Sequence, residues 1–158
     1  MKIWILSAVV ITVGCAGPAT ETARPDYEAE ALAVHAESLR AHRDGNWQWF
    51  GEAMTEPTWN VSKGAVKTST REQTLERFRN YLPHARFDRY EDIGEPIVRV
   101  SKDGTLAWVI ATVRIEGQMK SGPEAGASLN STWAWILLLE RQGDRWMRVG
   151  TVSTRVPD

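Results

Sequence analysis

The apolar positions change their period once along the chain, from a helical spacing to an extended one. In residues 25–43, the side chains of one stripe recur at steps of three and four residues, which predicts an amphipathic helix. A shorter helix is predicted for residues 46–54. A third helix begins at a capping-box pattern of Ser69 and Glu72 and ends at Pro83. The stripe of the first helix consists of Leu32, His35, Leu39 and His42.

From residue 84 onward, apolar and polar side chains alternate, which is the spacing of strands. Residues 58–68 fit either a strand or a loop around Gly64. Because the helices come first and the strands follow, the pattern predicts an α+β domain with an antiparallel sheet. The strand at 129–141 has apolar residues on both faces, so we expect it to be central and covered on both sides. The predicted strands are 84–93, 97–101, 105–117, 129–141 and 145–155.

The N-terminal segment has the pattern of a targeting sequence. Residues 3–13 form a continuous apolar run behind Lys2, and the single cysteine of the chain, Cys15, follows the run. The run has the length of a signal-peptide apolar region and is shorter than the roughly 20 residues that span a bilayer. Residues 12–15, Thr-Val-Gly-Cys, resemble a bacterial lipobox, which implies cleavage after residue 14 and fatty acylation of Cys15. A secretory signal cleaved at another site is the alternative.

Residues 15–25 are rich in small and polar side chains and bury little, so they are expected to form a flexible tether. The chain is thus divided into a signal peptide (1–14), a tether (15–25) and one domain (26–158). By resemblance to enterobacterial lipoproteins, Ala16 after the cysteine implies sorting to the outer membrane. The expected location is the bacterial cell envelope, with a lipid anchor on the periplasmic face of the outer membrane.

Composition narrows the classes of partner. The chain has 158 residues, enough for one domain with a core. Its 19 Lys and Arg nearly balance 20 Asp and Glu, and no basic run is interleaved with aromatics, so nucleic acid is not an expected partner. One cysteine cannot form an internal disulfide, and the sequence has no Cys/His cluster with metal-ligand spacing. We therefore expect neither a metal nor a cofactor.

Four short motifs lie in or next to the turns between the predicted elements. They are Asp44-Gly45-Asn46-Trp47, Gly64 with Arg71-Glu72, Asp103-Gly104 with Trp108, and Gly143-Asp144-Arg145-Trp146. In this order the motifs resemble the nuclear transport factor 2-like superfamily, in its SnoaL-like branch, over residues 26–155. The resemblance implies a cone-shaped, barrel-like domain in which N-terminal helices pack on a strongly curved antiparallel sheet and enclose a pocket. Members of this superfamily are isomerases, dehydratases, cyclases, hydrolases or binding modules, so the fold does not select a function.

The resemblance directs attention to titratable residues near the pocket. His35 and His42 lie on the stripe of the first helix, Tyr81 ends the third helix and Tyr90 lies on the first long strand. An apolar pocket could tune any of these four for general acid–base catalysis, and each also has a structural explanation in the core or at the rim. Asp92, on the same strand as Tyr90, is expected to be solvated.

The last strand departs from the family pattern. Many members carry a histidine near its end, but Val152 occupies that position here, and Arg148 replaces an aliphatic residue. Valine cannot transfer a proton, and the sequence offers no clear Asp–His or Tyr–Asp pair in its place. These departures argue against catalysis.

Eight tryptophans in a chain of this length indicate an aromatic-lined pocket or an aromatic sheet face that a second copy covers. We therefore expect an envelope-anchored lipoprotein that binds a small apolar ligand or a protein partner and forms a homodimer through the sheet face. The alternative is a pocket isomerase, dehydratase or hydrolase that uses general acid–base catalysis. The candidate pocket residues are Trp47, Phe50, Trp59, Phe78, Trp108, Trp133, Trp135 and Arg148.

Overall fold

The computed structural model describes residues 26–156, and its elements follow the predicted order of helices before most strands. The signal peptide, Cys15 and the tether predicted from the sequence lie outside the described residues. No helix among the described residues is long and apolar enough to cross a membrane. The elements are α1 (Tyr27–Arg43), α2 (Trp47–Glu52), β1 (Met54–Ser62), β2 (Ala65–Ser69), α3 (Arg71–Tyr81), the 3₁₀ helix η1 (Leu82–His84), β3 (Ala85–Asp92), β4 (Ile97–Val100), β5 (Leu106–Met119), β6 (Ser131–Gln142) and β7 (Arg145–Arg155).

The segment that the sequence left ambiguous, residues 58–68, belongs to a β hairpin. β1 pairs antiparallel with β2, and Ser62 lies opposite Ala65. The chain turns at Lys63 and Gly64, whose φ angles are 51° and 73°. Two central residues with positive φ match the twist that a two-residue hairpin requires. The second helix is also shorter than predicted, because Met54 already belongs to β1.

Polar side chains begin each of the three helices. Asp26 accepts a hydrogen bond from the Ala29 amide at the start of α1, and Asn46 has the same role at α2. The capping box of α3 is formed by Thr70 and Gln73, one residue later than predicted. The shift follows from the backbone, because Thr70 is extended (ψ 165°) and the helix begins only after it.

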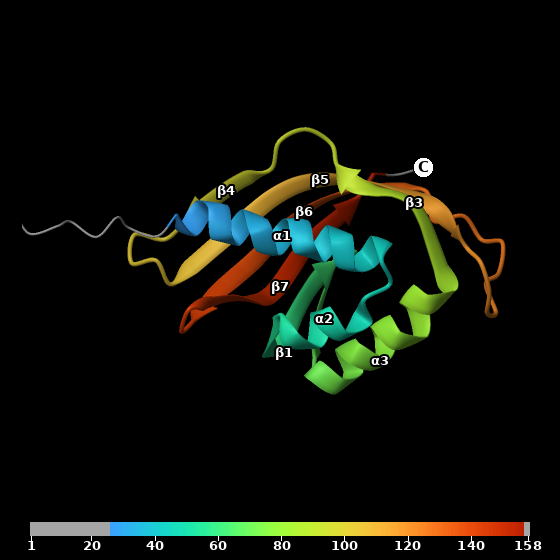
Figure 1. Ribbon diagram of the computed structural model, residues 1–158, viewed down its shortest axis with the longest axis horizontal. Coiled ribbons are helices and arrows are strands. Elements are labelled where there is room, and N and C mark those ends of the chain that lie inside the picture. The colour runs from blue at the N-terminus through green and yellow to red at the C-terminus, as the bar shows by residue number, and fades with distance from the viewer. Residues whose placement is uncertain (1–25, 157–158) are drawn as a thin grey trace, which may run out of the picture.

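The strands form one seven-stranded sheet in the order β2-β1-β7-β6-β5-β3, with β4 also paired to β5. The sheet is not closed. All neighbouring strands are antiparallel except β1 and β7, which are parallel, so the prediction of a wholly antiparallel sheet was wrong at this one pair. β6 lies between β5 and β7, as its apolar faces predicted. Figure 1 shows that α1 crosses the sheet and that α2 and α3 lie beside β1. β3 bends toward these two helices.

A bulge in β7 changes which side chains face the helices. Leu137 pairs with Thr151 and Leu139 pairs with Arg148, so the register shifts between these pairs and Val149 is the extra residue. Leu137 and Leu139 share one face of β6, which places Arg148 and Thr151 on that same face although they are three residues apart. Without the bulge, strand alternation would turn Arg148 away from Thr151.

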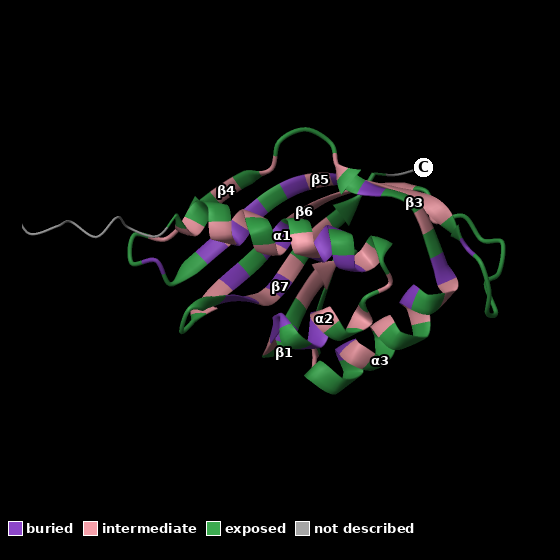
Figure 2. Ribbon diagram, viewed as in Figure 1, coloured by how far each residue is buried: buried purple, intermediate pink, exposed green. Residues whose placement is uncertain are grey.

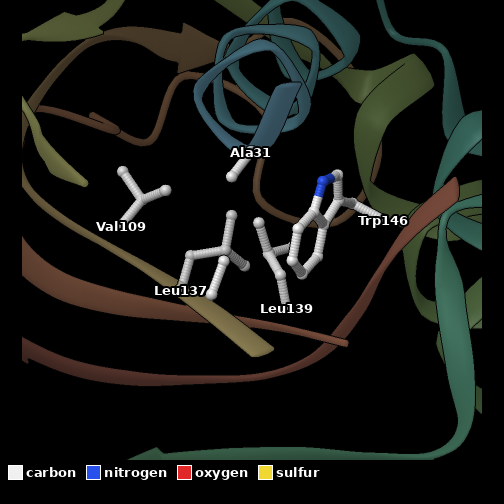
Figure 3. Close-up of a cluster of buried hydrophobic side chains, with 6 residues drawn as sticks. Ala31, Val109, Leu137, Leu139 and Trp146 are labelled. Carbon is white, nitrogen blue, oxygen red and sulfur yellow. The ribbon is translucent and has the colours of Figure 1, made fainter. Parts of the chain in front are cut away.

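The main apolar cluster fills the space between the first part of α1 and the sheet. Val109, Leu137 and Leu139 point from the strands toward Ala31 on α1, and Trp146 lies beside them (Figure 3). The Trp146 indole N–H donates to Glu30 on α1 at 3.1 Å. Figure 2 shows buried residues concentrated where α1 crosses β5 and β6. Because this part of the fold is filled, space for a ligand is left toward α3 and the end of β7.

Candidate functional site

A cavity of about 430 Å³ lies between the helices and the inner face of the sheet, a size in the range of small-molecule pockets. Its wall includes the four residues that the sequence analysis proposed for acid–base chemistry. His35 and His42 come from α1, Tyr81 from the end of α3 and Tyr90 from β3. The wall also includes five of the eight predicted pocket residues, namely Trp59, Phe78, Trp133, Trp135 and Arg148.

Three predicted pocket residues lie outside the wall. Trp108 pairs with Leu138, whereas Trp133 and Trp135 belong to the opposite face of β6, so the prediction that Trp108 lines the pocket was wrong. Phe50 is fully buried in a cluster with Ala41, Met54 and Leu82 and does not line the cavity. Trp47 packs against that cluster, with the Arg79 guanidinium 4.7 Å from its ring centre.

His42 is held in a cage of aromatic rings. It stacks on Tyr90 with ring centres 4.4 Å apart, and Phe50 and Phe78 meet it edge-on. Its Nδ1–H donates to the Ser38 carbonyl at 2.7 Å, which is the only role this nitrogen can have toward a carbonyl. Burial lowers the pKa of His42 to about 3. The imidazole is therefore neutral near pH 7 and is a weak base.

The two tyrosines of the wall are hydrogen-bond donors that keep their protons. Burial is the main cause that raises the pKa of Tyr90, and burial likewise raises the pKa of Tyr81. Both phenols therefore stay protonated at neutral pH and can donate hydrogen bonds to a ligand. Neither is suited to accept a proton there.

His35 forms a pair that the sequence analysis did not find. Its Nε2 lies 2.9 and 3.1 Å from the two carboxylate oxygens of Asp92, and the His35 side chain is 1% exposed. The expectation that Asp92 is merely solvated was therefore wrong. Because 57 residues separate the two, no local pattern connects them. Nε2–H donates to Asp92, and Nδ1 is left buried without a hydrogen-bond partner among the described residues.

Arg148 brings an uncompensated cation to the cavity. Its Nε and Nη1 atoms are shielded from solvent and have no hydrogen-bond acceptor within the described part of the chain. The rings of Trp49 and Phe50 lie 5.7 and 5.4 Å from its guanidinium carbon. Burial lowers the pKa of Arg148 to about 10, so the group is still charged at neutral pH.

The charges of the wall have one sign. Within residues 26–156, the wall includes Arg77, Arg148 and Arg155 and no aspartate or glutamate. None of the ion pairs closer than 4.0 Å in that range involves Arg77 or Arg148. The sequence analysis missed Arg77, because it follows no apolar period and only the fold brings it to the cavity. In the same range, no three His, Cys, Asp or Glu side chains gather as metal ligands would.

Val152 lies on the side of the sheet that faces away from the cavity. Val152 pairs with Ile136 on the outer face of the sheet and is 38% exposed, so it does not line the cavity. The bulge at Val149 shifts the alternation of β7, so Thr151 and Ser153 face inward instead. A missing histidine at residue 152 therefore removes nothing from this pocket.

No protein-family model matches the sequence, and no curated protein matches it. Solved structures do match. A ketosteroid isomerase-like protein from Erwinia carotovora atroseptica is 14% identical, with a TM-score of 0.65 over 85% of this chain and 99% of that one. A nuclear transport factor 2-like protein from Cytophaga hutchinsonii is 13% identical, with a TM-score of 0.64 over 80% and 95% of the two chains.

A third structure, a nuclear transport factor 2-like protein of unknown function in nutrient uptake from Rhodospirillum rubrum, is 20% identical. Its TM-score is 0.62 over 80% of this chain and 98% of that one. Identities this low carry the fold alone. The TM-scores of 0.62–0.65 over 80–85% of this chain show that it has the nuclear transport factor 2-like fold.

Proposed function

We propose that the domain binds a small organic molecule in the cavity between α1, α3 and the inner face of the sheet. The observation that carries this proposal is a cavity of about 430 Å³ whose wall combines aromatic rings with hydrogen-bond donors. Pockets of this kind hold small ligands by apolar contact, and a few polar groups fix their orientation. Trp133 and Trp135 supply the ring surface, and Tyr90 and Arg148 supply donors.

The titratable groups support binding more than catalysis. An efficient general acid or base has a pKa near the working pH. Burial lowers the pKa of His42 to about 3 and raises the pKa values of Tyr81 and Tyr90 above the usual value of a phenol. These three groups therefore keep one protonation state near neutral pH, which suits fixed hydrogen bonding.

A second candidate function is general acid–base catalysis as an isomerase, dehydratase or hydrolase, and the His35–Asp92 pair favours it. A carboxylate that accepts Nε2–H orients the imidazole and leaves Nδ1 as an acceptor, the arrangement of a general base. However, Nδ1 is shielded from solvent, so a substrate could reach it only after the surrounding side chains move. For this reason we place catalysis second.

We also propose that Cys15 anchors the domain to the membrane through lipid, as the lipobox resemblance implies, and that two copies pair through the outer sheet face. Exposed apolar side chains on that face support the pairing. Sedimentation at rising concentration tests it, and a monomer throughout would contradict it. The exposed apolar side chains of the outer sheet face are Ile97, Leu106, Ile110, Leu138 and Val152, which are 37–51% exposed.

The binding role can be tested with the neutral probe N-phenyl-1-naphthylamine, whose fluorescence increases in an apolar site. We expect it to bind the full chain and to lose binding in Thr151→Trp, because the indole fills the cavity. Val152→Trp is the matched control, since the neighbouring side chain lies on the outer face of the same strand. Unchanged binding in Thr151→Trp would contradict a ligand in this cavity.

A further inference from the structure

Arg148 is held where the protein supplies no anion for it. Two of its nitrogens are shielded from solvent and have no acceptor among the described residues. The nearby faces of Trp49 and Phe50 attract a cation but do not replace a directed hydrogen bond. A buried charge is normally paired, so an acceptor for Arg148 is expected from outside the chain.

Arg77 brings a second positive charge to the same cavity. Burial is the main cause that lowers the pKa of Arg148, and the charge of Arg77 lowers it further, so the two positive charges of the wall repel each other. No carboxylate within residues 26–156 lies within 4.0 Å of either group. An anion near both groups would relieve this repulsion.

The remaining wall defines the rest of the ligand. Tyr90 lines the same cavity, and burial raises the pKa of its phenol, so it adds a neutral donor to the wall. Trp133 and Trp135 on β6 and Ile115 on β5 offer an apolar surface in the same cavity. The cavity thus has a cationic part and an apolar part, and an amphipathic anion matches both.

Building on the binding role above, we propose that Arg148 and Arg77 bind the carboxylate of a small organic acid, whose apolar body lies against Trp133 and Trp135. A carboxylate offers two oxygens that fit the planar fork of a guanidinium. Free phosphate would also meet the charges, but it has no body to contact the indole rings. The inferred ligand class is therefore a monocarboxylic acid with an aromatic or aliphatic body.

The test compares two probes that share one apolar body and differ in charge, 2-naphthoate and 2-naphthamide. Their binding to the full chain is measured by equilibrium dialysis at pH 7 against a blank of the same detergent. We expect 2-naphthoate to bind at least tenfold more tightly than 2-naphthamide, and to bind more weakly as salt is raised. We expect inorganic phosphate to compete poorly.

Two variants test whether Arg148 causes the preference for 2-naphthoate over 2-naphthamide. In Arg148→Met, we expect the preference for 2-naphthoate to fall below about twofold while the affinity for 2-naphthamide stays the same. Retained affinity for the amide also shows that the variant is folded. Arg99→Met is the matched control, because Arg99 is exposed on β4 and pairs opposite Trp108, whose face lies away from the cavity.

Each outcome decides between the proposals. Equal affinity of the two probes for the unmodified chain would overturn the carboxylate site and leave the binding role standing. A preference that survives in Arg148→Met would also overturn it. If phosphate displaces 2-naphthoate at equal concentration, the site is for free phosphate and the organic-acid proposal is wrong. If neither probe nor N-phenyl-1-naphthylamine binds, the binding role fails and this inference fails with it.

Discussion

Replacing Arg148 by methionine should make the unliganded domain more stable. Methionine keeps much of the length and apolar contact of the arginine stem but removes the charge. The substitution eliminates two shielded N–H donors that have no acceptor in the described chain. Each such donor costs about 1–3 kcal/mol when it is left unsatisfied.

The opposing term is the loss of contact between the cation and two rings. Trp49 and Phe50 lie 5.7 and 5.4 Å from the guanidinium carbon, and each contact contributes about 0.5–2 kcal/mol. At the midpoints of these ranges, about 4 kcal/mol is gained and about 2.5 kcal/mol is lost, which leaves Arg148→Met more stable by about 1.5 kcal/mol. For a domain of this size, that corresponds to a rise in Tm of roughly 3–10 °C.

Differential scanning calorimetry and urea unfolding, each without ligand, measure the change. Arg99→Met serves as the control and should stay within about 0.5 kcal/mol of the unmodified chain, as exposed substitutions usually do. Addition of 2-naphthoate should raise the Tm of the unmodified chain and leave that of Arg148→Met nearly unchanged. A loss of more than about 1 kcal/mol in Arg148→Met would refute the reasoning, because the cation would then be a net stabilising part of the fold.

Three further predictions concern other parts of the chain. Gly150→Ala should destabilise the domain by about 1–3 kcal/mol in urea unfolding, because its Cβ would lie 2.5 Å from the Trp59 carbonyl oxygen; Thr151→Ala should change much less. The unfolded chain protonates His42 near pH 6.5 and the folded chain only near pH 3, so stability should fall by about 1–2 kcal/mol from pH 6.5 to about pH 5. His42→Phe should remove this pH dependence of the stability. An unchanged pH dependence would contradict a neutral imidazole at residue 42 in the folded chain. Cys15→Ser should abolish labelling with a fatty-acid probe and release the chain from the membrane; unchanged labelling would exclude lipidation.

The element order was predictable because the hydrophobic periods are strong. The first helix, the third helix and all five strands after residue 84 were found where the sequence placed them, within a few residues. The β1–β2 hairpin was left open between a strand and a loop, because β1 is mostly polar or partly exposed and gives little alternation. The parallel pairing of β1 with β7 depends on contacts between residues about 90 positions apart, which no local period encodes.

The site was less predictable than the fold because it depends on register. Simple alternation from Trp146 along β7 assigns Thr151 and Arg148 to opposite faces, and the bulge at Val149 reverses this. The same bulge makes Val152 an outer residue, so comparing the last strand position by position with a family motif wrongly assigned residue 152 to the pocket. His35 and Asp92 meet only because α1 packs across β3.

The bulge at Val149 therefore decides which side chains in the second half of β7 line the cavity. With the bulge, the face of β7 that begins at Trp146 continues inward through Arg148 and Thr151. Arg148 precedes the bulge, and the bulge adds Thr151 and Ser153 to the same face, in a cavity whose wall has no carboxylate within the described chain to neutralise the guanidinium. Polar groups that lower the stability of a fold occur more often at ligand sites than at positions with a purely structural role. Among the groups on this wall, Arg148 meets that description best, because the pairs of His35 with Asp92 and of His42 with Ser38 are already made within the protein.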